Sequence, residues 1–153
     1  MIYGYVRIST RQQNIERQIR NIKNEYENEN VKIIEEVYTG TKIEGRKEFN
    51  NLLKKLKEGD TVVFDSVSRM SRNAEEGFEI YKELFEKGIN LVFLKEKHIN
   101  TDTYKQALSN NIQMTGTLVD SILEGINTYL LALAQQQIKL AFEQSEKEVT
   151  DLQ

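Results

Sequence analysis

Residues 2–13 read IYGYVRISTRQQ, and this stretch decides how the N-terminal part of the chain folds. The run from Ile2 to Ile8 is rich in β-branched and aromatic residues, which favour a strand. Ser9 and the polar residues after it end that run. The stretch therefore predicts a strand that presents polar side chains at its carboxyl end.

Three further β-rich runs follow, separated by helical patterns. They are Val31 to Tyr38, Thr61 to Phe64 and Ile89 to Leu94. Strands that alternate with helices are typical of an α/β fold. We expect a mostly parallel central sheet of four to five strands flanked by helices. The strand carboxyl ends and the loops after them should share one edge of that sheet, where ligands usually bind.

Three helices are expected between the strands, each indicated by apolar spacing or a capping residue. They are a helix with Ile15, Ile19 and Ile22 after an N-cap at Asn14, a helix from about Arg46 to Lys57, and a helix that begins at Asn73 in a capping box with Glu76 and ends before Gly88.

From Val119 onward the sequence predicts one long helix with two apolar stripes. The stripes are Val119, Leu123, Ile126, Leu130 and Leu133, and Leu131, Ala134, Ile138, Phe142 and Val149. A domain this small can cover only one of them. Either the helix lies deep in the core, or a second copy covers Leu131, Ala134, Ile138 and Phe142. We interpret residues 1–153 as one domain, with an α/β part over about residues 1–100 and the long helix over about 117–150.

Composition limits the classes of function. The 153 residues include no cysteine and one histidine, so disulfides and thiolate metal sites are excluded, and no metal or cofactor is expected. His98 follows the fourth strand and is interpreted as a solvated loop residue. No run approaches the ~18 apolar residues of a membrane span, so no membrane partner and a cytoplasmic location are expected. The net charge of -3 argues against nucleic-acid binding through bulk charge, although residues 1–20 hold four arginines against one acid.

Two polar clusters are the candidates for chemistry. Alternation along the first strand places Tyr5, Arg7 and Ser9 on one side. Arg69 and Arg72 follow the third strand and are three residues apart, so both can lean over one anion. Each cluster alone also fits a structural interpretation, as a capping loop or as solvated arginines. Because both should open onto the same edge of the sheet, together they predict a multi-arginine site around a hydroxyl.

A guanidinium binds two phosphate oxygens at once and stays charged, which suits a phosphodiester that gathers negative charge in its transition state. The serine could then act as nucleophile without a metal. A free hydroxyl is a weak nucleophile, so either the nearby cations favour its deprotonated form or an unidentified base takes the proton.

The chain resembles the resolvase/invertase family of serine recombinases. The residues that carry the resemblance are Tyr5-Val6-Arg7-Ile8-Ser9-Thr10 with Gln13 and Gln18, Gly45-Arg46-Lys47-Glu48-Phe49, and Ser68-Arg69-Met70-Ser71-Arg72. The resemblance implies that Ser9 attacks a DNA phosphate to give a phosphoserine-DNA intermediate and a free 3'-hydroxyl. It further implies that the phosphate is bound by Arg7, Arg46, Arg69 and Arg72, with Tyr5, Gln13 and Gln18 in support. The partners it implies are double-stranded DNA and further copies of the chain, as a dimer and a tetramer, with no metal or nucleotide.

The chain departs from the family pattern at two places. Many members carry an acid directly before the first arginine of the second cluster, where this chain has Ser68, while Asp65 is nearby but out of register. The family's long helix leads to a separate DNA-binding domain, and this sequence stops at Gln153 in helical, acidic residues. We expect that domain, and its basic charge, to lie outside these residues. The segment between Gly40 and Gly45 reads as a mobile loop that delivers Arg46, or as a passive turn.

Three other functions also fit parts of this sequence. A receiver-like signalling module would use Asp65 as phosphoacceptor and Lys95 as its contact. Such a module needs a magnesium ion held by carboxylates after the first strand, where this chain offers Arg7, Ser9 and Arg11. A hydrolytic phosphodiesterase could use the same arginines, and an accessory domain could merely oligomerise through the long helix.

Overall fold

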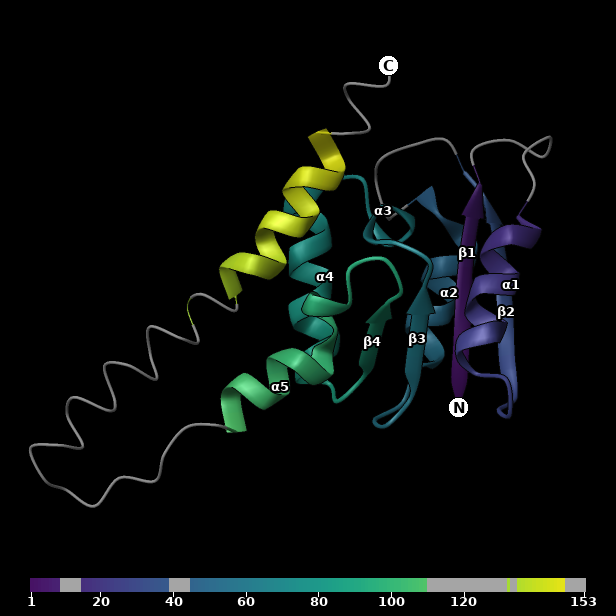
Figure 1. Ribbon diagram of the computed structural model, residues 1–153. Coiled ribbons are helices and arrows are strands. Elements are labelled where there is room, and N and C mark those ends of the chain that lie inside the picture. The colour runs from purple at the N-terminus through teal and green to yellow at the C-terminus, as the bar shows by residue number, and fades with distance from the viewer. Residues whose placement is uncertain (9–14, 39–44, 110–131, 133–134, 148–153) are drawn as a thin grey trace, which may run out of the picture.

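The computed structural model describes residues 1–8, 15–38, 45–109, 132 and 135–147. Its sheet has four parallel strands in the order β2-β1-β3-β4, as Figure 1 shows. The strands are β1 (Ile2–Ile8), β2 (Val31–Val37), β3 (Thr61–Phe64) and β4 (Asn90–Phe93). The predicted α/β class and the parallel sheet are confirmed, and each observed strand lies within its predicted run.

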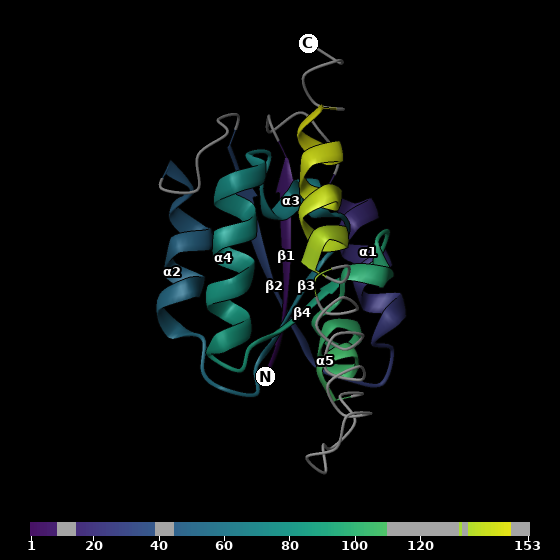
Figure 2. The same ribbon diagram turned by 90° about the vertical axis from the view of Figure 1, so that its left-hand side faces the viewer.

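The helices cover both faces of the sheet. Their bounds are α1 (Glu16–Glu25), α2 (Lys47–Lys55), α3 (Val67–Met70), α4 (Ala74–Glu86) and α5 (Thr101–Ser109), with a 3-10 turn η2 at Lys97–Ile99. In Figure 2, α1 lies on one side of the sheet and α2 and α4 on the other. The sequence predicted α1, α2 and α4. It did not predict α3, which has four residues, or α5.

A side-chain cap explains where α4 begins, and the N-cap positions of α1 and α2 differ from the predicted ones. The Asn73 side chain accepts a hydrogen bond from the Glu76 amide at 2.9 Å, so the predicted N-cap of α4 is confirmed. The N-cap residue of α1 is Ile15, which makes no side-chain cap, rather than Asn14, which lies outside the described residues. Arg46 is the N-cap residue of α2 rather than its first helical residue.

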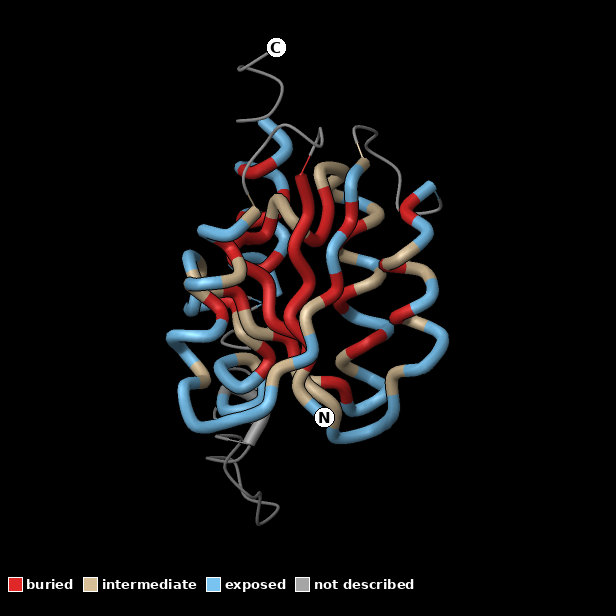
Figure 3. Tube along the Cα trace, turned by 90° about the vertical axis from the view of Figure 1, so that its right-hand side faces the viewer, coloured by how far each residue is buried: buried red, intermediate tan, exposed pale blue. Residues whose placement is uncertain are grey.

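Strand β1 lies in the middle of the sheet and is buried along nearly its whole length (Figure 3). Its alternate residues serve two separate cores. Tyr3 and Tyr5 pack with Phe49 and Phe64 in the core that includes α2 and α4, while Val6 packs with Ile22 in the core under α1. Arg7 has the same parity as Tyr5 and so points toward the first of these cores. A charged side chain is therefore carried into the buried side of the sheet, close to its carboxyl edge.

The helix over residues 135–147 packs on α4 in both views of the fold. Ile138 and Phe142 are buried within this chain, and the Phe142 ring makes edge contacts with Tyr81 and Phe93. The expectation that a second copy covers Ile138 and Phe142 is therefore wrong, because α4 and β4 already cover them. Leu131, Ala134 and the predicted start at Val119 lie outside the described residues.

Gly77 explains how closely the two helices approach. A Cβ atom at Gly77 would lie 2.7 Å from the Phe142 ring and 2.9 Å from the Cβ of Ser71.

Within the part of the chain that the structure describes, no helix is both long enough and apolar enough to cross a membrane.

Candidate active site

The carboxyl edge of the sheet brings together most of the residues that the sequence singled out. Tyr5, Arg7, Gln18 and Arg46 are buried there, and Arg69 and Arg72 are partly buried. Ser9 and Gln13 lie outside the described residues, so the predicted convergence of arginines on the Ser9 hydroxyl stays a prediction.

Arg7 is the most deeply buried of the described arginines at this edge, with 1% of its surface exposed. Its Nε donates to the carbonyl of Arg69 at 3.3 Å, its Nη1 donates to the carbonyl of Tyr38 at 3.3 Å, and its Nη2 donates to the carbonyl of Ser68. Burial, together with repulsion from Arg72 and Arg46, lowers the pKa of Arg7 to about 9. The guanidinium therefore ties the end of β1 to the α3 segment.

Arg69 returns this contact, because its Nη1 donates to the carbonyl of Arg7 at 3.0 Å. Its Nε is buried and has no hydrogen-bond partner among the described residues. Burial lowers the pKa of Arg69, and the charge of Asp65 opposes that shift while Arg72 adds to it. Arg72 thus lies within electrostatic reach of both Arg7 and Arg69, as the two predicted clusters require.

Arg46 reaches the same place from the start of α2. Its Nη1 donates to the carbonyl of Arg69 at 2.8 Å, and its Nη2 donates to the carbonyl of Met70. The guanidinium lies over the Phe49 ring, 4.5 Å from its centre, and burial lowers its pKa. The predicted meeting of Arg46 with the two clusters is therefore observed.

Glu36 is a member of this group that the sequence interpretation missed. Its carboxylate is buried and accepts hydrogen bonds from the Tyr5 hydroxyl at 2.6 Å and from the amides of Glu48 and Phe49 at 2.8 and 3.1 Å. Burial is the main reason that the pKa of Tyr5 lies above its usual value, so Tyr5 stays a donor. The carboxylate stabilises the N-terminus of α2. The sequence did contain a signal for this role of Glu36. It is an acidic residue at a core-facing position of β2, in register with Arg7 on β1.

Gln18 binds the backbone of Arg7 rather than facing the open edge. Its Oε1 accepts from the Arg7 amide at 3.2 Å, and its Nε2 donates to the Arg7 carbonyl at 3.0 Å. The Gln18 side chain thus makes the two hydrogen bonds to the Arg7 backbone that a neighbouring strand would otherwise make. Arg7 lies two positions before Ser9.

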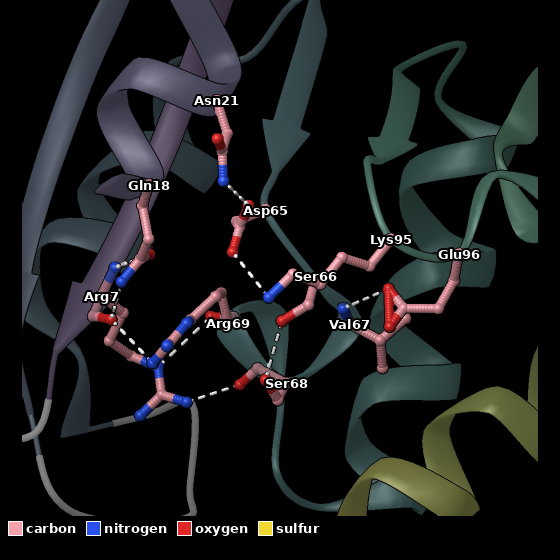
Figure 4. Close-up of polar contacts among 10 residues, drawn as sticks. All are labelled: Arg7, Gln18, Asn21, Asp65, Ser66, Val67, Ser68, Arg69, Lys95 and Glu96. Atoms are coloured by element: carbon pink, nitrogen blue, oxygen red, sulfur yellow. Dashed lines mark hydrogen bonds and ion pairs between the residues drawn. The ribbon is translucent and has the colours of Figure 1, made fainter. Parts of the chain in front are cut away.

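Asp65 and Ser68 have different surroundings. The buried Asp65 carboxylate accepts from Nδ2 of Asn21 at 3.0 Å and pairs with Nζ of Lys95 at 3.3 Å (Figure 4). The Ser68 hydroxyl lies 2.9 Å from that of Ser66. Asp65 therefore contacts α1 and the end of β4, whereas Ser68 contacts Arg7 through its carbonyl.

His98 is exposed in η2, as predicted for a solvated residue. Among the described residues, no group of three or more His, Cys, Asp or Glu side chains could hold a metal ion.

Comparison with known proteins agrees with this geometry. Residues 2–148 match the family described as "Resolvase, N terminal domain". A resolvase from Clostridium perfringens is 33% identical over 101 residues, which are 66% of this chain and 52% of that protein. The transposon Tn501 resolvase from Pseudomonas aeruginosa is 33% identical over 96 residues, 61% of this chain and 46% of that protein. The chain thus spans about half the length of the curated relatives that it matches.

Among solved structures, a resolvase family site-specific recombinase from Streptococcus pneumoniae has the same fold. Its TM-score is 0.54 at 21% identity, and the alignment covers 99% of this chain and 97% of that one. The family match covers all of the described residues that build the arginine-rich edge. This chain belongs to the resolvase family and corresponds to the family's N-terminal domain.

Proposed function

We propose that this chain is the catalytic domain of a site-specific DNA recombinase in which Ser9 attacks the scissile phosphodiester. The observation that carries the proposal is the packing of Arg7, Arg46 and Arg69, with Arg72 in electrostatic reach, at the end of the strand that leads into Ser9. Ser9 would form a phosphoserine-DNA intermediate and release a 3'-hydroxyl. That hydroxyl would later attack the phosphoserine and restore the DNA backbone.

The arginines supply the charge that this reaction needs. In-line attack concentrates negative charge on the phosphate oxygens, and guanidinium groups in a site of low dielectric stabilise that charge strongly. The same cations lower the free energy of a serine alkoxide, since an opposite charge nearby favours the charged form of a group. A separate base that accepts the Ser9 proton is the alternative.

The described geometry supports a division of roles among the site residues. Tyr5 and Gln18 are held by Glu36 and by the Arg7 backbone, so both would act by positioning. Arg7 and Arg46 hold α3 through backbone carbonyls, and Arg69 and Arg72 are the less buried pair. In this proposal all four arginines bind and polarise the phosphate, and Gln13 supports them.

The partners belong to the proposal as well. The substrate would be double-stranded DNA at two recombination sites, brought together by a homotetramer built from homodimers, in the cytoplasm. Sequence recognition would come from a DNA-binding domain outside residues 1–153, with the α/β part over about residues 1–100 doing the chemistry. Residues 135–147 pack on α4 of the same chain, so the part of the predicted long helix that would connect the subunits is the part before residue 135.

The test joins this domain to a sequence-specific DNA-binding domain and supplies a supercoiled plasmid with two target sites, in buffer with EDTA. The proposal predicts recombinant circles, in which every cut strand has been rejoined. A hydrolytic phosphodiesterase would leave cut products that never rejoin, and a receiver-like module would leave the plasmid intact. Either result would contradict the proposal.

A further inference from the structure

The strands β1 and β3 part at the edge where the arginines gather. Their pairing runs from Ile2 opposite Thr61 to Tyr5 opposite Phe64, and β3 then ends. The β1 strand continues through Arg7 to Ile8, and no described strand pairs with it there on that side. The end of β1 and the chain leading into α3 therefore lie on either side of a gap in the ladder.

One turn of α1 spans this gap. Gln18 and Asn21 are three residues apart on α1, so their side chains leave the same side of the helix. Figure 4 shows Gln18 reaching the backbone of Arg7 and Asn21 reaching the carboxylate of Asp65. The first contact holds the end of β1, and the second holds the residue that directly follows β3.

Lys95 extends the same set of contacts to the next strand. Its Nζ pairs with Asp65 at 3.3 Å, and its backbone amide donates to the Asp65 carbonyl at 3.1 Å. We name Gln18, Asn21, Asp65 and Lys95 the α1 clamp. The α1 clamp joins helix α1 to the ends of β1, β3 and β4.

Asp65 is buried at the end of β3, so its charge needs partners within the protein. Only 4% of its side chain is exposed, and a buried carboxylate is costly unless its oxygens are paired. Here each oxygen has a partner from a different element. The carboxylate also supplies a negative charge that opposes the burial-driven lowering of the pKa of Arg69.

We propose that Asn21 and Asp65 are positioning residues that fix the width of the gap between β1 and β3. That width sets how Arg69 lies against the Arg7 carbonyl, two residues before Ser9. The inference rests on the proposed function for its catalytic consequence, but the geometric consequence can be measured without DNA.

The test exchanges the amide and the carboxylate. Asn21→Asp alone sets two carboxylates against each other and should push the strand ends apart. Adding Asp65→Asn restores one amide and one carboxylate in reversed order, so the double variant should regain the contact. Asn24→Asp, at an exposed position one helical turn further on, adds the same charge to the same helix away from Asp65 and serves as the matched control.

The first readout is hydrogen exchange of the Arg7 amide in the DNA-free chain, with β2 amides as the internal reference. We expect faster exchange in Asn21→Asp, recovery in the double variant and no change in Asn24→Asp. The second is the cleavage rate at saturating DNA in the fusion protein, which should fall and recover in the same order while DNA affinity stays constant. If Asn21 and Asp65 only stabilised the fold, Asn21→Asp would lower the melting temperature, and the cleavage rate at saturating DNA would not fall while DNA affinity stayed constant.

Two results would overturn the proposal. They are unchanged Arg7 exchange in folded Asn21→Asp, and an equal loss in Asn24→Asp. If Asn21→Asp does not fold, Asn21→Ala removes the bridge without adding charge and should show a smaller loss in the same direction. If the wild-type fusion does not cleave DNA, the proposed function fails, and the exchange measurement still decides whether the clamp holds β1.

Discussion

The side chain of Gln18 forms two hydrogen bonds with the backbone of Arg7, one through each end of its amide. Both groups are buried, so a variant that removes the partner leaves a buried amide and carbonyl less well satisfied. We predict that Gln18→Ala lowers the free energy of unfolding by about 2–4 kcal/mol, at about 1–2 kcal/mol for each hydrogen bond. Chemical denaturation measures this loss. Gln18→Glu keeps the acceptor but loses the donor, and should fall between the wild type and Gln18→Ala. Equal stability of all three proteins would contradict the assignment.

Glu36 should matter far more than its neighbour Glu35. The Glu36 carboxylate accepts three hydrogen bonds, from Tyr5 and from the start of α2, whereas Glu35 is exposed on the other side of the same strand. We predict that Glu36→Gln costs about 1–3 kcal/mol of unfolding free energy, while Glu35→Gln changes it by less than about 0.5 kcal/mol. Thermal unfolding of the two variants gives the comparison. Similar losses in both would show that the carboxylate does not hold α2.

Gly77 reports on the docking of the C-terminal helix. In an isolated helix, Gly→Ala stabilises by about 1 kcal/mol. Here the new Cβ would lie 2.7 Å from the Phe142 ring, and such overpacking typically costs about 1–3 kcal/mol. We predict that Gly77→Ala is destabilising, and that the double variant with Phe142→Ala loses less than the sum of the two single losses. A Gly77→Ala protein more stable than wild type would mean that residues 135–147 do not pack on α4.

The pKa of Arg7 sets a pH dependence with a definite sign. Its folded value is about 9, below the 12.5 of an unperturbed guanidinium, so between these values the unfolded chain binds more protons at this residue. The contribution of Arg7 to the free energy of unfolding should therefore increase as the pH rises through about 9. The measurement is the stability difference between the wild type and Arg7→Met across that range. A difference that stays constant would contradict the lowered pKa.

The sequence predicted the fold well because its signals were local. The β-branched runs and the Asn73 cap are determined by neighbouring residues, and the structure confirms both. The helix α3 was missed because its four residues are too few to show a helical period. The prediction that a second copy buries Ile138 and Phe142 was wrong. An apolar stripe indicates that a helix surface is buried, but it does not indicate which element buries it.

The candidate site was predicted in part, because the order of the strands determines where some of its residues lie. Arginines after parallel strands must share an edge, so the meeting of Arg7 with Arg69 followed from strand order. The roles of Glu36 and Asn21 could not be predicted this way, since each depends on a contact with another element far along the chain. Such contacts are fixed by register and helix placement.

The central claim is that Ser9 is the nucleophile, and the most direct measurement is mass spectrometry of the covalent protein-DNA adduct. The fusion protein is incubated with a nicked target duplex in EDTA, denatured and digested, and the peptide that carries the nucleotide is identified. The account predicts a phosphoester at Ser9, absent in Ser9→Ala and retained in the matched control Ser66→Ala. An adduct at another residue, or an adduct that persists in Ser9→Ala, would contradict it.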